Sequence, residues 1–408
     1  MLSVDEARAR IVAAGRRRPA TPTALRQAAG LVLGADVVAR RDLPGFDNSA
    51  MDGFALRAGD VASASSGRPV RLRLLGEVAA GAVFGGRVET GGAVRIMTGA
   101  PLPKGADAVL EVEETAMDAD GVLALRAVER GRSIRRAGED IRRGEVALAA
   151  GAFLGPAQLG LLAALGEAAP VCIPRPRVAL LATGDELVDV EVEPGPGQVV
   201  DIGVAFAAAA VGAGAEVVPV LRAADAREDL ERALRQAAEA DVVVSVGGVS
   251  MGEYDLVRKV VEKLGALDFW KVAIRPGKPL AVGRVLDRSF VGLPGNPVSA
   301  LVGFEVFVLP LLLAMGGRDG WSRPLLDAEL ATGLSTPPGL RTFARARLQA
   351  RRGSTPLAHP VAQGSHQLHA LANSDALLDI GEEAGALPAG AAVKAILVNH
   401  PPLPPLAG

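Results

Sequence analysis

The sequence predicts a multidomain protein of the α/β plus β class, with a doubly wound, mostly parallel α/β domain at its centre. Between Val178 and Val291, short apolar runs alternate with helical patterns, which is typical of strand-helix-strand units in a parallel sheet. The run Val242–Val246 is rich in valine and indicates a strand buried on both faces. Short strands at close spacing precede and follow this domain, so we expect β domains on both sides of it.

The chain of 408 residues is long enough for several domains of roughly 150 residues each. We expect a helical linker domain, a small β-rich domain, the α/β domain and a C-terminal small β domain. Their expected bounds are 1–42 together with 131–172 for the linker domain, 43–130, 173–318 and 319–408.

Helices are expected near the amino terminus and before the α/β domain. Ser3 has the side chain of an N-cap, and Asp5 and Glu6 follow in the first helical turn. We expect a second helix over Thr23–Ala29 and a third from Pro156 to about Leu165, with proline at its first position. The third helix is expected to pack with the amino-terminal ones.

The remaining elements follow from periodicity and turn residues. A loop rich in proline and glycine, Arg95–Asp107, lies inside the β-rich domain. The apolar run Val298–Met315 contains Glu305 and Pro310 and indicates a buried helix rather than a membrane span. Expected strands are Val70–Leu74, Val122–Leu125, Val178–Ala182, Glu216–Leu221, Val242–Val246, Trp270–Ile274, Leu280–Val282, Ser289–Val291, Thr342–Leu348 and Ala391–Leu397, and expected helices are Val204–Ala213, Arg227–Ala240 and Asp255–Leu264.

The composition excludes several function classes. With 44 basic and 46 acidic residues, the net charge of −2 argues against a nucleic-acid or membrane-surface partner held by bulk charge. Cys172 is the single cysteine, which excludes an internal disulfide and a cysteine zinc site and favours a reducing compartment, the cytoplasm. The amino terminus lacks the apolar region of a signal peptide. All four histidines lie after residue 358, so we expect no histidine-based catalysis in the α/β domain.

The segment that follows Val246 is the first candidate site. Gly247 and Gly248 free the backbone amides where the strand ends, and Ser250, Glu253 and Asp255 add a hydroxyl and two carboxylates. Such a loop suits a phosphate together with a cation. A plain strand-to-helix turn, in which glycine only relieves crowding, explains the loop equally well.

Three further loops belong to the same domain. They are Thr183–Leu187, Arg275–Pro279 and Leu293–Ser299. Because loops after parallel strands gather at one sheet edge, we expect a shared crevice in which Asp185, Glu186 and Asp255 can hold Mg²⁺. Positive charges at Lys271, Arg275 and Lys278 suit phosphate. This combination favours phosphoryl or nucleotidyl chemistry.

Two charged segments lie outside the α/β domain. Leu43–Ala55 contains Asp47 and Asp52 and is either a solvated turn or part of a site. Ile134–Glu145 contains four arginines among three acids, which indicates either a surface network of ion pairs or a binder of a highly charged anion.

Seven segments together resemble the molybdopterin molybdotransferase family of the MoeA type, which includes the C-terminal region of gephyrin. Each segment is weak evidence alone, but all seven occur in the family order across nearly the whole chain. They are Pro44–Ala55, Met97–Pro103, Arg136–Asp140, Thr183–Leu187, Gly247–Gly252, Pro276–Pro279 and Leu293–Ser299.

The resemblance implies a cytoplasmic homodimer with a molybdopterin-binding α/β domain and a barrel-like C-terminal domain. Such a protein inserts molybdenum from molybdate into adenylylated molybdopterin with Mg²⁺, and it releases AMP with the molybdenum cofactor. The site is expected to be shared between the α/β domain of one subunit and the small β domain of the other. The adenylyltransferase that supplies the substrate and the apo-molybdoenzymes that receive the cofactor are the expected protein partners.

The resemblance also assigns roles residue by residue. Glu186 and Asp255 are the expected metal ligands. Two positions depart from the family pattern: Gly203 stands where asparagine is usual after Asp201, and Arg275 stands where lysine is common. The expected catalytic residues are Asp52, Asp140, Glu186, Asp201, Asp255, Lys271, Arg275 and Lys278, and the expected substrate-binding residues are Thr183, Gly184, Asp185, Gly247, Gly248, Ser250, Pro294, Pro297 and Ser299.

Two other functions compete with this prediction. The related molybdopterin adenylyltransferase resembles residues 175–316, but it is normally a compact single-domain protein, so the flanking β domains argue against it. A non-catalytic scaffold of the gephyrin type is the second alternative, and the acidic residues named above argue against that one.

Overall fold

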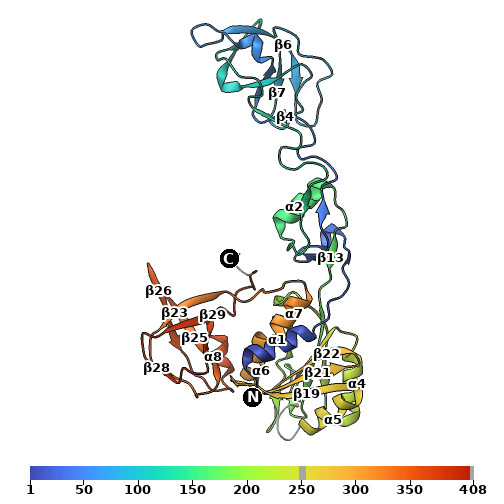
Figure 1. The fold of residues 1–408 in the computed structure, drawn as a ribbon, viewed down its shortest axis with the longest axis vertical. Coiled ribbons are helices and arrows are strands. Elements are labelled where there is room, and N and C mark those ends of the chain that lie inside the picture. The colour runs from blue at the N-terminus through green and yellow to red at the C-terminus, as the bar shows by residue number, and fades with distance from the viewer. Residues whose placement is uncertain (248–253, 405–408) are drawn as a thin grey trace. The chain divides into compact units, whose positions relative to one another are not determined.

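The computed structural model describes residues 1–247 and 254–404, and these residues form two compact units (Figure 1). The large unit consists of Met1–Pro22, Gly30–Gly34 and Val171–Gly408, and the small unit consists of Thr23–Ala29 and Ala35–Pro170. The division into four domains remains a prediction.

The sheet at the centre of the large unit has the strand order β17-β14-β18-β22-β21-β19. The first four strands are parallel, whereas β21 is antiparallel to β22 and β19 is antiparallel to β21. The predicted mostly parallel sheet is therefore confirmed. Its strands are β14 (Arg177–Thr183), β17 (Glu216–Ala223), β18 (Val242–Val246), β19 (Gly265–Lys271), β21 (Pro279–Val285) and β22 (Arg288–Leu293).

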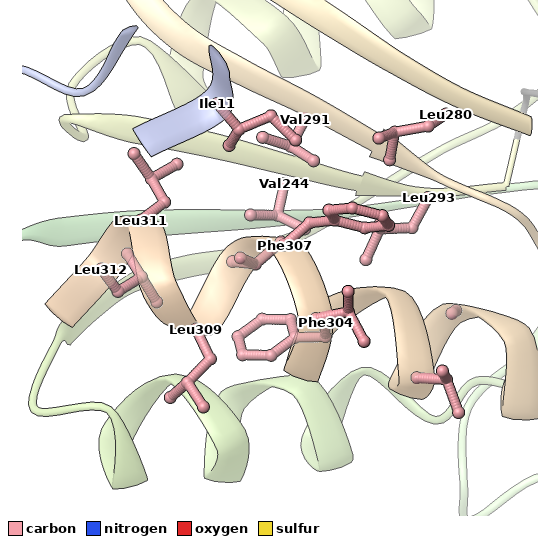
Figure 2. Packing of buried hydrophobic residues seen from close by; sticks show 14 of the residues in the cluster. Ile11, Val244, Leu280, Val291, Leu293, Phe304, Phe307, Leu309, Leu311 and Leu312 are labelled. Carbon is pink, nitrogen blue, oxygen red and sulfur yellow. The ribbon is translucent and has the colours of Figure 1, made fainter. Parts of the chain in front are cut away.

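Helices cover both faces of this sheet. Alternate residues of each strand point to opposite faces, so each face presents apolar side chains on which helices pack. Val243 and Phe290 pack toward α4 and α5, whereas Val244 and Val291 pack toward α1, α3 and the long helix that follows β22. Figure 2 shows the second core, in which Ile11 lies beside Val291 and in which Phe304 and Phe307 of the long helix belong to the same cluster. The helices are α1 (Val4–Ala14), α3 (Gly203–Gly212), α4 (Arg227–Ala237) and α5 (Tyr254–Leu264).

The long helix after β22 is continuous over Pro297–Met315. It consists of α6 (Pro297–Gly303), a π-helical turn over Phe304–Val308 and α7 (Leu309–Met315). Its 19 residues are long and apolar enough to cross a membrane, but 78% of the apolar window is buried within the protein. Burial against the sheet explains the apolar composition, as predicted for a core helix.

The C-terminal part of the large unit is a closed barrel. Strands β25, β26, β23, β29 and β27 pair in that order, and β27 pairs again with β25. The short strand β20 (Ile274–Arg275), which follows β19, pairs with β25 and links the two sheets. The barrel elements are β23 (Leu325–Leu330), β25 (Arg341–Arg351), β26 (Ser354–Pro360), α8 (Leu368–Ala372), β27 (Ala376–Ile380) and β29 (Ala392–Ile396).

The small unit is built on a sheet of strand order β8-β5-β7-β6-β10-β9. Two separate strand pairs, β3 with β12 and β4 with β11, also belong to this unit. Helix α2 (Pro156–Leu165) has proline at its start, as predicted. The strands are β3 (Val37–Val38), β4 (Asn48–Ser49), β5 (Gly53–Leu56), β6 (Val70–Val78), β7 (Gly92–Ile96), β8 (Ala108–Glu111), β9 (Thr115–Asp118), β10 (Gly121–Ala124), β11 (Ile134–Arg135) and β12 (Val146–Leu148).

Two predictions about elements were wrong, and a third was confirmed only in part. The expected helix Thr23–Ala29 is only a 3₁₀ turn over Leu25–Gln27, because no side chain caps its start and Gly30 ends it with a positive φ. The expected strand Trp270–Ile274 is divided between β19 and β20. The expected packing of the third helix with the amino-terminal ones is confirmed in part, because α2 contacts the turn Leu25–Gln27, whereas α1, which Ser3 caps as predicted, packs on α7 in the large unit.

Candidate functional site

Three loops of the α/β sheet meet at the edge where the parallel strands end. Gly247 follows β18 with a φ of +94°, and a Cβ at this position would lie 2.6 Å from the carbonyl oxygen of Thr183. A Cβ at Gly295 would lie 3.4 Å from the Cα of Gly247. Glycine is therefore required at position 247 for the loops after β14 and β18 to approach this closely, and the loop after β22 packs against it.

A cavity of about 300 Å³ lies beside this junction. The carboxylate-bearing residues Glu186 and Asp201 line it together with apolar side chains such as Phe206. The structure thus brings several predicted site residues into one cavity, although their roles remain predictions. The lining comprises Leu180, Leu181, Ala182, Thr183, Glu186, Leu187, Val199, Val200, Asp201, Ile202, Gly203, Phe206, Val220, Val246, Gly247, Gly295 and Pro297.

The carboxylate of Glu186 folds back over the backbone of Gly184. A Cβ at position 184 would lie 2.4 Å from Oε2 of Glu186, and the φ of Gly184 is +144°. Glu186 is half-buried, and within residues 1–247 and 254–404 no hydrogen bond or ion pair holds its carboxylate. A half-buried acid without a partner is suited to bind a ligand or a cation.

Asp201 has a structural task in addition to its place in the cavity. Its Oδ1 accepts a hydrogen bond of 2.8 Å from the backbone N–H of Gly203 at the start of α3, and its Oδ2 lies 3.8 Å from the guanidinium of Arg222. A Cβ at position 203 would lie 3.3 Å from Oδ1 of Asp201, so glycine leaves room for this carboxylate.

Asp225 was missed by the sequence analysis, although it follows β17 at the same sheet edge. Its backbone N–H donates to Oδ1 of Asp185 at 2.9 Å, and the N–H of Asp185 lies 3.4 Å from Oδ2 of Asp225. The rule that loops after parallel strands share one edge could have identified this loop from the sequence.

The predicted phosphate-binding cations lie at the same edge. Lys271 ends β19 opposite Pro279, where β21 begins, and Lys278 directly precedes Pro279. Arg275 lies in β20 and pairs with Thr342 of the barrel. All three side chains are exposed, and in the described part of the chain none of them has an ion-pair partner.

Pro294, Pro297 and Ser299 surround the start of the long helix. Pro294 and Ser299 are buried, and a Cβ at Gly277 would lie 3.2 Å from the carbonyl oxygen of Ser299. Pro297 occupies the first turn of α6. The Gly277 loop and the helix start therefore pack directly against each other.

The barrel contributes two residues that the sequence analysis missed. Arg345 is only 2% exposed, its Nη1 donates to the carbonyl oxygen of Gly364 at 3.1 Å, and its Nε has no partner among the described residues. Burial lowers the pKa of the Arg345 guanidinium. Ser365 meets the α/β domain, because Nδ2 of Asn296 lies 3.2 Å from its Oγ. The sequence did contain a signal for Arg345, because it is a charged residue within the otherwise apolar, buried run Thr342–Ala346.

Part of the predicted site lies outside the described residues. Gly248 and Ser250 belong to that segment, and Asp255 lies in the first turn of α5 without a described side chain. In residues 1–247 and 254–404, no group of three or more histidine, cysteine, aspartate or glutamate side chains could hold a metal ion.

The small unit gathers the remaining motifs in a loop cluster of its own. Asp52 accepts hydrogen bonds from the backbone N–H and the hydroxyl of Thr98 at 2.7 and 2.8 Å. These two bonds, the backbone bond first, lower the pKa of Asp52. Asp140 is exposed and lies in a separate loop of this unit, where its N–H donates to the carbonyl oxygen of Leu43.

Asp47 links its own loop to the loop that contains Arg136 and Ala137. It accepts from the N–H of Ala137 at 2.8 Å and forms an ion pair of 2.7 Å with Arg136. The bond from Ala137, followed by that from Arg136, lowers the pKa of Asp47 although partial burial opposes the shift. Of the two predictions for the segment Ile134–Glu145, a surface network of ion pairs and an anion binder, the structure shows an ion pair for Arg136.

Comparison with known proteins identifies the family. Three family models match the chain: the MoeA N-terminal region (domain I and II) over residues 2–166, a probable molybdopterin binding domain over 179–314 and the MoeA C-terminal region (domain IV) over 327–398. The chain belongs to the MoeA family. The resemblance seen in the seven sequence segments is thereby confirmed.

Relatives within the MoeA family match nearly the whole chain. Molybdopterin molybdenumtransferase 2 of Mycobacterium tuberculosis is 43% identical over 402 residues, which cover 96% of this chain and 98% of the relative. The molybdopterin molybdenumtransferase of Haemophilus influenzae is 36% identical over 98% of this chain and 99% of its own length. The crystal structure of the molybdopterin biosynthesis MoeA protein from Pyrococcus horikoshii has a TM-score of 0.82 at 31% identity and covers 98% of this chain and 99% of its own.

Proposed function

We propose that this MoeA protein is a molybdopterin molybdenumtransferase, which inserts molybdenum from molybdate into adenylylated molybdopterin and releases AMP. The observation that carries the proposal is the cavity at the sheet edge, where Glu186 and Asp201 face an apolar lining within a chain matched by MoeA models along its length. Related molybdenumtransferases of similar length support the assignment.

The shape and lining of the cavity suit the organic part of this substrate. A volume of about 300 Å³ with walls such as Phe206, Ile202 and Val246 suits a planar ring. Thr183 adds a buried Oγ1 that lacks a partner among the described residues, so a polar group of a ligand would satisfy it.

The phosphate groups of the substrate would lie at this edge of the sheet, outside the cavity. Lys271, Arg275 and Lys278 supply exposed positive charge there, and the glycine backbones at 247 and 295 allow close approach of an anion. Charge at this position favours departure of AMP, because negative charge develops on the leaving phosphate.

Molybdate, the metal donor, would bind where the barrel meets the α/β domain. Arg345 is a buried cation whose Nη1 donates to a carbonyl group and whose Nε is unpaired among the described residues. A tetrahedral oxyanion relieves the unfavourable burial of such a charge and accepts from its planar donors. The hydroxyl of Ser365, held by Asn296, lies in the turn that Arg345 binds.

The carboxylates present fit Mg²⁺ as the cofactor. Mg²⁺ is commonly held by one or two carboxylates together with water and substrate phosphates. Glu186 has an unpaired carboxylate in the described structure, and Asp255 is the second proposed ligand. When bound, Mg²⁺ would neutralise phosphate charge, while the residues of the cavity orient the substrate and exclude water.

In a homodimer with a shared site, acidic residues from the small unit of one subunit and the large unit of the other would lie in the same site. Asp52 and Asp140 of the small unit would act with Glu186 of the partner's large unit. Helix α3 supports self-association, because Val204 and Val211 on this apolar helix are 76% and 61% exposed. We place the protein in the cytoplasm, with an adenylyltransferase before it and apo-molybdoenzymes after it.

The decisive experiment is anaerobic incubation with adenylylated molybdopterin, Mg²⁺ and molybdate. AMP release and reconstitution of a molybdenum-free apoenzyme are measured together, and we expect both to depend on molybdate. Consumption of ATP by molybdopterin without molybdate would contradict the proposal and indicate an adenylyltransferase. Bound substrate with neither product would indicate a scaffold.

A further inference from the structure

The backbone of Arg345 is held by a glutamine side chain in place of a neighbouring strand. Strand β26 pairs with β25 as far as Pro360, opposite Ala346, and the N–H of Val361 then donates to the carbonyl oxygen of Arg345 at 3.0 Å. Beyond Val361 the chain leaves the sheet. Gln363 Oε1 accepts from the N–H of Arg345 at 3.0 Å, and its Nε2 donates to the carbonyl oxygen of Arg345 at 2.8 Å.

The Gln363 amide and a second glutamine, Gln367, hold the two ends of the turn that follows. Nε2 of Gln363 also donates to the carbonyl oxygen of Val361 at 2.5 Å, and the N–H of Gly364 donates to Oε1 of Gln367 at 2.7 Å. A Cβ at Gly364 would lie 2.8 Å from Oε1 of Gln367 and 2.9 Å from Cε1 of His366. A side chain at position 364 would therefore displace the flexible ends of Gln367 and His366.

This turn connects both anion-binding candidates of the barrel. The carbonyl oxygen of Gly364 accepts from the guanidinium of Arg345, and the next residue, Ser365, is held by Asn296 of the α/β domain. Gln363 consequently controls the backbone from which Arg345 extends as well as the turn that presents Ser365.

We propose that Gln363 is a positioning residue that holds Arg345 and Ser365 in the arrangement that binds molybdate. This inference rests on the proposed function and deepens it. An arginine side chain has many rotamers, so binding an oxyanion is favoured when its backbone and one guanidinium nitrogen are fixed beforehand. Without the Gln363 amide, the N–H of Arg345 and the carbonyl oxygen of Val361 lose their side-chain partner and the turn loosens.

Two substitutions test the proposal. Gln363→Ala removes all three bonds, whereas Gln363→Glu keeps an acceptor for the N–H of Arg345 and cannot donate to the carbonyl groups. The matched control is Gln349→Ala, because Gln349 lies exposed on the same strand and its Oε1 contacts Nε2 of the half-buried His359 at 2.9 Å.

Calorimetry with sodium molybdate alone and AMP release at varied molybdate concentration are the two measurements. For both Gln363 variants we expect Kd and KM for molybdate to rise by about tenfold or more, with kcat at saturation within about threefold of the unmodified enzyme. Gln349→Ala should match the unmodified enzyme.

Two outcomes would overturn the role of Gln363. One is an unchanged molybdate Kd in both variants. The other is a lower rate of AMP release at every molybdate concentration, with an unchanged molybdate Kd and a lower melting temperature. That combination indicates a purely structural role. If Gln363→Ala does not fold, Gln363→Glu carries the test, since it retains the side-chain length and one hydrogen bond.

The proposed function fails separately. If the unmodified protein binds molybdate but releases no AMP, the transferase assignment is contradicted, whereas the comparison of Kd values still decides the role of Gln363. If the unmodified protein binds no molybdate in calorimetry, both proposals are overturned.

Discussion

At the scale of single residues, Gly247 occupies a crowded backbone position at the sheet edge. Its φ is +94°, and a Cβ at this position would lie only 2.6 Å from the Thr183 carbonyl oxygen, so there is no space for a side chain. We expect Gly247→Ala to destabilise the large unit by about 3 kcal/mol, from backbone strain together with the steric clash. The measurement is the urea midpoint of unfolding.

Gly197 provides the matched control for this substitution. Its φ is +83°, but a Cβ there would meet nothing within 4 Å. Gly197→Ala therefore introduces strain without a clash, and we expect it to destabilise by only about 1 kcal/mol. Equal effects of the two substitutions would show that the close approach of the loops is unimportant.

The hydrogen bonds from Thr98 make a prediction about pH. They lower the pKa of Asp52 below its ordinary value of 3.8. Because the folded pKa is depressed, the stabilisation from Asp52 is fully present above 3.8 and is lost as the pH falls through the folded pKa. Thr98→Val removes the hydroxyl donor and keeps the backbone donor, so the pKa of Asp52 should rise part of the way toward 3.8.

A carbon-detected NMR titration of the Asp52 carboxyl group measures this shift. Thr90→Val is the control, because Thr90 bonds to Arg57 in the same unit and does not contact Asp52. An unchanged Asp52 titration in Thr98→Val would assign the whole shift to the backbone bond and contradict the role of the hydroxyl.

At the scale of elements, the π-helical turn in the long helix carries an unusual charge. Glu305 lies in this turn and forms a two-point ion pair with Arg323, with distances of 2.9 and 2.7 Å. The two side chains are only 17% and 10% exposed. We expect Arg323→Met to destabilise the large unit by about 3 kcal/mol, because it leaves the Glu305 carboxylate buried and unpaired.

The double variant Glu305→Met with Arg323→Met separates the cost of burial from the value of the pair. With both charges removed, the urea midpoint should return to within about 1 kcal/mol of the unmodified protein. A double variant as unstable as Arg323→Met would instead show that the ion pair itself stabilises the helix.

Periodicity was sufficient to predict most elements of the α/β sheet. The runs at Val178, Val242 and Ser289 each formed a buried parallel strand, because they carry a continuous apolar signal. The division between β19 and β20 was not predictable, since the pairing of Ile274 with Arg341 in the barrel decides it. Local sequence does not contain that long-range contact.

The same limit applies to the candidate site. Thr183, Glu186 and Gly247 were identified because their loops follow strands of one sheet, and the structure places all three at one cavity. Arg345 and Ser365 were missed because they reach the α/β domain only through the packing of the barrel, such as the bond between Asn296 and Ser365.

At the scale of the whole molecule, the proposed homodimer with a shared site makes a prediction about mixtures of subunits. Asp52→Asn and Glu186→Ala alter the small and the large unit respectively, and each variant alone should be inactive in AMP release. In a dimer with shared sites, a mixed dimer has one site with both residues intact. After exchange of subunits at equal concentration, activity should recover to about a quarter of the unmodified value.

Mixing two preparations of the same variant is the control for this experiment. Subunit exchange is followed by mass spectrometry of differently isotope-labelled proteins. No recovery in fully exchanged mixtures would contradict the shared site, because each subunit would then need its own Asp52 and Glu186.

The path of the chain between the two units has an evolutionary consequence. The chain leaves the large unit after Gly34 and returns at Val171, and the N–H of Gly34 donates to the carbonyl oxygen of Val171 at 2.9 Å. Leu33 and Cys172 face each other in neighbouring antiparallel strands. The excursion of Ala35–Pro170 thus has adjoining ends, as in an inserted domain. Because Thr23–Ala29 also belongs to the small unit, that short segment would have to change together with the excursion if the module were gained or lost.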